Sequence, residues 1–108
     1  LRYTKIGKMV FYVIRLVITS LGTLTTTQDA VIGGMPFTSR NQTNYQQVGV
    51  ARGSSLSITA GQALNGAVQV NDTIFYLGLW DAAGGSTSIL LSEVTAAGNL
   101  EVSGHYEV

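Results

Sequence analysis

The segment from Met9 to Thr19 constrains the fold most, because an extended chain places apolar side chains on both of its faces. Strand alternation puts one set on the first side, namely Val10, Tyr12, Ile14, Leu16 and Ile18. The opposite side holds Met9, Phe11, Val13, Arg15, Val17 and Thr19. A strand with one solvated face usually alternates apolar with polar residues, so this second face must be covered, inside the domain or by another subunit. We favour another subunit, with an interface formed by Phe11, Val13, Arg15 and Val17.

The rest of the chain predicts an all-β fold. Thirteen glycines, many threonines and serines and several β-branched runs favour strands, and no helical apolar stripe is present. Besides the first long strand, we expect strands at residues 29–32, 45–51, 55–59, 67–70, 74–81, 88–91 and 100–108, and one helical turn at 92–97. About eight short strands suit a single domain, 1–108, folded as a two-sheet antiparallel β-sandwich of the jelly-roll type. Because the strand pattern begins almost at Leu1, we expect a C-terminal fragment of a longer protein.

Composition excludes several classes of partner. Apolar residues make up 45% of the chain and charged residues 11%, so apolar surface remains that an assembly would cover. Six basic and six acidic residues cancel, and without a basic cluster nucleic-acid binding loses its main driving force. The absence of cysteine excludes disulfides and thiolate metal sites. The apolar run from Met9 to Ile18 is shorter than the about 20 residues of a membrane-spanning helix, so we expect no membrane insertion.

Catalytic and metal-binding patterns are absent from the sequence. His105 is the only histidine, and Ser103 and Glu107 share its strand face, but neighbours on one strand rarely reach the geometry of a catalytic triad. A Gly-x-Ser-x-Gly elbow is also missing. The carboxylates are dispersed, and the sequence pairs none of them across a cleft as a glycosidase requires. We therefore expect no enzyme activity, no cofactor and no metal, although loop oxygens would still suit calcium.

The segment 74–81 contains the main candidate for a ligand site. Alternation separates Phe75, Leu77 and Leu79, which we expect in the core, from the opposite face of Tyr76, Gly78 and Trp80. Two rings that flank a glycine leave a flat recess for a sugar ring, with Asp81 near it to accept hydroxyl hydrogen bonds. Aromatic stripes more often pack against protein, so a role in the core or at an interface stays open.

A second candidate precedes this segment in the chain. Tyr45, Gln47 and Gly49 form a mixed strand face, and the polar loop before them ends at Asn44. Amide side chains offer both donors and acceptors to sugar hydroxyls. Tyr45, Gln47 and Asn44 are therefore predicted as additional ligand-binding residues.

Three short motifs resemble a module of bacteriophage tail fibres and tailspikes. Residues Tyr3-Thr4-Lys5-Ile6-Gly7-Lys8 are similar to its usual Tyr-Thr-Lys-Ile-Gly opening. Residues Gly34-Met35-Pro36-Phe37-Thr38 are similar to its Gly-Leu-Pro-Phe connection, with methionine in place of leucine. Residues Ser103-Gly104-His105-Tyr106 are similar to its closing Ser-Gly-x-Tyr strand. The resemblance spans nearly the whole chain. It implies a trimeric β-sandwich in a virion appendage, joined to other tail fibre segments, and it brings no catalytic residues with it.

Together these observations predict non-catalytic recognition of a bacterial surface polysaccharide or lipopolysaccharide by a homotrimer, in which repeated weak sites gain avidity. The module would act on the virion, outside the host cell. Two alternatives remain: a domain that only trimerises and caps the fibre, and an accessory domain of a glycan-degrading tailspike.

Overall fold

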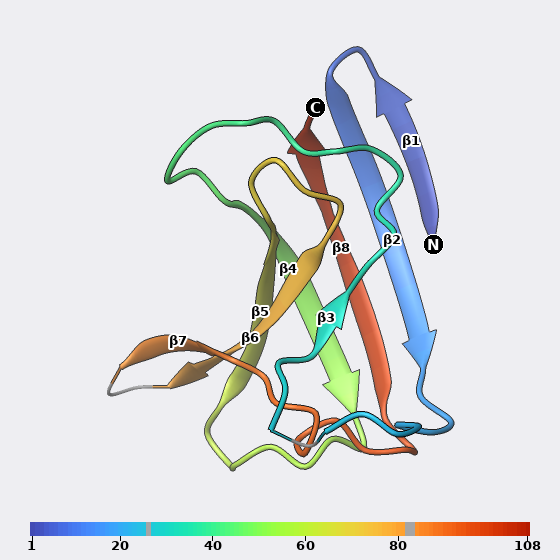
Figure 1. Ribbon diagram of the computed structural model, residues 1–108, viewed down its shortest axis with the longest axis vertical. Coiled ribbons are helices and arrows are strands. Elements are labelled where there is room, and N and C mark those ends of the chain that lie inside the picture. The colour runs from blue at the N-terminus through green and yellow to red at the C-terminus, as the bar shows by residue number, and fades with distance from the viewer. Residues whose placement is uncertain (26, 82–83) are drawn as a thin grey trace.

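The computed structural model describes residues 1–25, 27–81 and 84–108, and these residues form eight strands (Figure 1). The strands are β1 (Arg2–Ile6), β2 (Met9–Val17), β3 (Val31–Ile32), β4 (Gln47–Ser54), β5 (Ala63–Val68), β6 (Phe75–Asp81), β7 (Gly85–Ser88) and β8 (Asn99–Glu107). Residues with β-branched or aromatic side chains, which favour strands, are frequent in β1, β2 and β6. The described part of the chain contains no helix. The all-β prediction is therefore confirmed.

The strands hydrogen-bond into one antiparallel sheet and not into two separate ones. Their order is β1-β2-β8-β4-β5-β6-β3, and β7 pairs with β6 outside this path. The longest ladder joins the two longest strands, from Met9 opposite Glu107 to Val17 opposite Asn99. Figure 1 shows how the sheet curls, so that β3 and β6 lie in front of β2 and β8. The fold is a half-barrel, in which one sheet supplies both sides of the core.

The core fills the inner face of this curled sheet. Its largest fully buried side chains are Tyr106, Phe75, Leu79, Ile89, Leu100, Val10, Val68 and Val102. Two inward aromatic rings rest directly on glycine backbone: a Cβ atom on Gly66 would lie 2.4 Å from the Phe75 ring, and one on Gly49 would lie 2.5 Å from the Tyr12 hydroxyl. These glycines are therefore packing residues inside strands, where any side chain would displace a ring.

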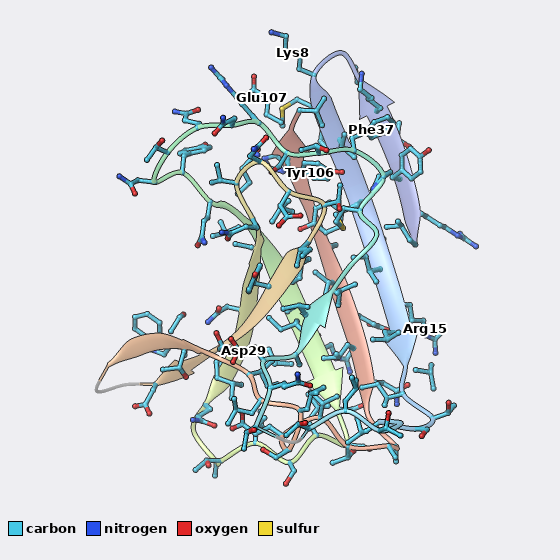
Figure 2. All side chains as sticks on the ribbon, viewed as in Figure 1. Lys8, Arg15, Asp29, Phe37, Tyr106 and Glu107 are labelled. Carbon is cyan, nitrogen blue, oxygen red and sulfur yellow. The ribbon has the colours of Figure 1, made fainter. Side chains whose placement is uncertain are left out.

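The connection between β3 and β4 is fastened to the sheet by Phe37. The Tyr106 hydroxyl donates a hydrogen bond to the Phe37 carbonyl oxygen (3.0 Å) and accepts one from its amide (3.2 Å). The Phe37 ring meets the edge of Tyr3 at 5.7 Å between centroids, and the Lys5 ammonium lies 5.6 Å from the same ring. Figure 2 shows Phe37 and Tyr106 close together. The three motifs at Tyr3–Lys8, Gly34–Thr38 and Ser103–Tyr106 thus meet at one place in the fold.

Several strand boundaries differ from the sequence prediction. Residues 55–59 form no strand: Leu56 and Ile58 pack against the core, while the Ser57 amide bonds to the Glu93 carbonyl oxygen at 2.8 Å. The helical turn predicted at 92–97 is also wrong, because the backbone there forms separate turns. The strand predicted at 67–70 begins earlier, at Ala63, and ends at Val68, so β5 includes Asn65 and Gly66. The strand predicted at 88–91 is wrong for most of its length, because β7 spans Gly85–Ser88 and shares only Ser88 with it.

The buried hydroxyls of Tyr12 and Tyr106 differ in their hydrogen bonding. Among the described residues, the Tyr12 hydroxyl has no hydrogen-bond partner, whereas that of Tyr106 holds Phe37. Burial, with a smaller effect of Tyr106, raises the pKa of Tyr12 to about 12. Burial also raises the pKa of Tyr106, although its bond to the Phe37 backbone opposes that shift. Both side chains are therefore neutral near pH 7.

These two tyrosines give a matched test of the fold. Tyr106→Phe should lower the free energy of unfolding by about 1–3 kcal/mol, because it leaves the Phe37 backbone groups without a partner. Tyr12→Phe should leave the free energy of unfolding unchanged within about 0.5 kcal/mol or raise it, because it removes an unpaired hydroxyl and keeps the ring. Urea unfolding of both variants measures the difference. A larger loss from Tyr12→Phe would contradict the assigned hydrogen bonds.

Candidate functional site

The outer face of the half-barrel carries a groove over strands β4 to β7. Strand β6 contributes side chains to the core from its inner face and to the groove from its outer face. Phe75, Leu77 and Leu79 are at most 3% exposed on its inner face, as the alternation predicted. Trp80, on its outer face, is 54% exposed, and Tyr76 on the same face is partly exposed. Both rings line the groove, which has a volume of about 550 Å³.

The space between the two rings is occupied by an amide side chain. Asn65 of β5 pairs with Gly78 in the ladder, and a Cβ atom on Gly78 would lie 2.5 Å from the Asn65 Oδ1. The Asn65 Nδ2 donates a 2.8 Å hydrogen bond to the Ser86 Oγ of β7. The open recess expected at Gly78 is therefore filled by Asn65, whose amide is held between the two rings.

A pair of glutamine side chains lines another part of the groove. The Gln46 Nε2 donates a 3.0 Å hydrogen bond to the Gln69 Oε1, and both side chains line the groove. Val48, which is 75% exposed, adds an apolar border on β4. The groove thus combines aromatic surface with amides and hydroxyls, the combination that binds the flat apolar face and the hydroxyl rim of a sugar ring.

The other predicted ligand residues lie elsewhere. Asp81 follows Trp80 at the end of β6 but is not among the residues that line the groove. Tyr45 is 54% exposed in the loop before β4, and Asn44 next to it has a left-handed backbone (φ 61°). The Gln47 side chain bonds to the Glu107 backbone of β8, accepting from its amide and donating to its carbonyl oxygen at 3.2 Å. Gln47 therefore joins two strands, and the neighbouring Gln46 is the glutamine that lines the groove.

The second face of β2 is uncovered in the single chain. Phe11, Val13 and Val17 are 45%, 55% and 56% exposed, and Val50 on β4 is 74% exposed. Arg15 is exposed too, with its Nε 3.9 Å from the Glu101 Oε1 on β8. Figure 2 places Arg15 at the end of β2 farthest from Lys8. We call this surface of β1, β2, β8 and β4 the outer apolar face.

The candidate groups for catalysis are engaged in other contacts. The ring of His105 packs against Phe11 at 5.8 Å between centroids, and Glu107 forms an ion pair with Arg40 at 2.9 Å. The described residues include no group of three histidine, aspartate or glutamate side chains placed to hold a metal ion. No helix in this part of the chain is both long and apolar enough to cross a membrane.

A second hollow, of about 540 Å³, opens beside β3 at the end of the half-barrel near Asp29. Its lining is mostly aliphatic, and includes Leu16, Leu21, Leu24, Ile32 and Leu91. It offers apolar contact but few hydrogen-bonding groups. Compared with this aliphatic hollow, the groove has the donors and acceptors that recognition of a polar ligand requires.

The exposed ring of Trp80 should matter little for folding. Trp80→Ala should change the free energy of unfolding by less than about 1 kcal/mol, because more than half of the side chain is already in solvent. Phe75→Ala, five residues earlier on the buried face, should cost about 3–5 kcal/mol. Chemical denaturation of the two variants compares them. A comparable loss from both would assign Trp80 to packing and remove it from the candidate site.

Comparisons with known proteins identify no relative of this chain. No protein-family model, no curated protein and no solved structure matches the chain. The candidate site is therefore defined by the groove between Tyr76 and Trp80 and by the amides of Gln46, Asn65 and Gln69.

Proposed function

We propose that this domain is a non-catalytic module that binds a bacterial surface glycan through the groove over β4 to β7. The observation that carries the proposal is the exposed Trp80 beside Tyr76, with the amide of Asn65 fixed between them. An aromatic ring covers the apolar face of a sugar, and side-chain amides exchange hydrogen bonds with its hydroxyls. Binding and not chemistry is the proposed activity.

The proposed setting is a phage tail fibre or tailspike, and it rests on the resemblance of three motifs. Tyr3, Phe37 and Tyr106, one from each motif, contact one another at a single junction of the fold. A junction that fastens the connection before β4 to the sheet gives these motifs a common structural task. This contact supports the resemblance, because residues needed at one place in a fold are expected to occur together.

We further propose that copies of this chain cover the outer apolar face and form a homotrimer, with three as the number implied by the resemblance. On this face Val13 of β2 and Val50 of β4 lie on either side of Ser103 of β8. Two residues along β8, Arg15 and Arg52 lie on either side of Glu101 in the same way. Among the described residues Arg52 makes no ion pair, while Glu101 is still half exposed beside Arg15. Arg52 of one copy is thus complementary to Glu101 of the next. In a closed symmetric trimer the neighbouring copies would cover these valines, and the assembly would present one groove on each copy.

Glycan binding should depend on the Trp80 ring. Trp80→Ala should weaken binding to any recognised surface polysaccharide by at least about tenfold, since stacking on an aromatic ring is lost. A glycan array probed with the wild type identifies the ligand, and titration calorimetry compares the variant. Tyr45→Ala is the matched control, because its ring is equally exposed but outside the groove. An equal loss from both variants, or none from Trp80→Ala, would exclude the groove.

Self-association should depend on the valines of the outer apolar face. Val50→Glu should shift the protein to monomers in sedimentation at micromolar concentration, because a buried unpaired carboxylate opposes assembly. Leu24→Glu is the control, since Leu24 is 60% exposed away from this face. A folded wild-type protein that sediments as a monomer would refute the homotrimer.

The same two experiments separate the alternatives. A homotrimer that binds no bacterial glycan favours a domain that only trimerises and caps a fibre. Release of shortened oligosaccharides from capsular or lipopolysaccharide substrates by the parent protein would place the domain beside a glycan-degrading tailspike unit.

A further inference from the structure

We infer that the groove selects neutral glycans and rejects glycans that carry carboxylates, sulfates or phosphates. The inference rests on the proposed function, because it names the ligand class of the same site. It follows from the charge of the groove and its surroundings. None of the described residues that line the groove is charged.

The cationic side chains of the protein lie away from the groove. Arg2 and Lys5 lie on β1, Lys8 in the following turn and Arg15 on β2, two or more strands from β4, the nearest strand of the groove, in the sheet order. Arg40 is paired with Glu107 at 2.9 Å. The remaining cation is Arg52, on the same strand as the groove residue Val48.

Arg52 does not line the groove. It follows Gly49, the nearest groove residue of β4, by three residues, which corresponds to about 10 Å along an extended strand. This separation exceeds the screening length of about 8 Å at physiological ionic strength, so its attraction for an anion in the groove is weakened. Arg52 and Arg15 instead line a separate polar hollow with Glu101.

An anionic sugar finds no counter-charge among the described residues of the groove. Its charged group would leave water for a surface without a cation, and this loss of hydration opposes binding. Proteins that hold carboxylate or phosphate groups usually provide arginine or lysine for them.

A neutral sugar finds suitable partners in the same place. The hydrogen bonds from Asn65 to Ser86 and from Gln46 to Gln69 each use one donor and one acceptor, and an amide group has two donors and two acceptor sites. The unused groups remain for hydroxyls or acetamido groups, while the two internal bonds hold the amides in place. This preorganisation lowers the conformational entropy lost on binding.

The test is an array that carries neutral polymers of glucose, mannose, galactose and N-acetylglucosamine beside polymers containing uronic acid, sialic acid or sulfate. We expect the bound glycans to be neutral, with acidic polymers at least about tenfold weaker. Affinity for the bound polymer should change by less than about twofold between about 0.05 and 0.5 M salt, because no ion pair is formed.

A charge introduced into the groove checks the mechanism. Ser88 lies beside Gly78 in the ladder, is exposed and lines the groove. Ser88→Lys should raise affinity for acidic polymers in a salt-sensitive way, whereas Leu24→Lys, which adds the same charge elsewhere, should not.

The outcomes distinguish the inference from the proposed function. Acidic glycans that bind the wild type tightly and lose binding in Trp80→Ala would overturn the neutral specificity and leave the glycan-binding function standing. Binding of no glycan on the array would overturn the proposed function, and the inference with it. Equal gains from Ser88→Lys and Leu24→Lys would show that net charge and not the groove controls selection.

Discussion

Close contact between aromatic rings and glycine backbone is the constraint on which the half-barrel depends. Phe75 occupies the space where Gly66 would carry a side chain, and the Tyr12 hydroxyl approaches both Gly49 and Gly104. The rings of Tyr12 and Phe75 meet at 6.1 Å between centroids, so they join distant strands across the inner face. Glycines in β4, β5 and β8 therefore let a single sheet curl around large rings, and a sheet that curls in this way needs no second sheet to bury its core.

The same principle shapes the candidate site on the outer face. Gly78 leaves room for the Asn65 side chain, as Gly66 leaves room for Phe75 on the inner face. Both glycines lie in the β5–β6 hairpin, whose inner side is core and whose outer side is groove. Tyr76 and Trp80 lie on β6, whose alternate side chains Phe75, Leu77 and Leu79 are buried. This explains how an exposed tryptophan can be held in a defined position without contributing much to stability.

Strand alternation predicts the β6 part of the site but misses its amides. Phe75 and Trp80 are assigned to the correct faces because β6 has clear two-residue periodicity. Asn65 is missed because Asn-Gly is a strong turn signal, whereas in the fold this pair lies inside β5, bonded to its neighbours in the sheet, with Gly66 under the Phe75 ring. On β4 the periodicity misleads, because exposed valines mark the outer face while small residues lie under the rings of the core. The chain reveals which residues alternate, and tertiary packing decides which face is inside.

Val48 connects the two surfaces proposed for function. It borders the groove and belongs to the same outward row of β4 as Val50 on the outer apolar face. An assembly that covers Val50 would bring a neighbouring copy close to the rim of the groove, since the two valines are about 7 Å apart along the strand. A glycan in the groove would then contact one copy through Trp80 and approach the next across β4. Assembly would therefore raise the number of sites and also extend the surface that each glycan contacts. A monomer with the same groove would have neither advantage.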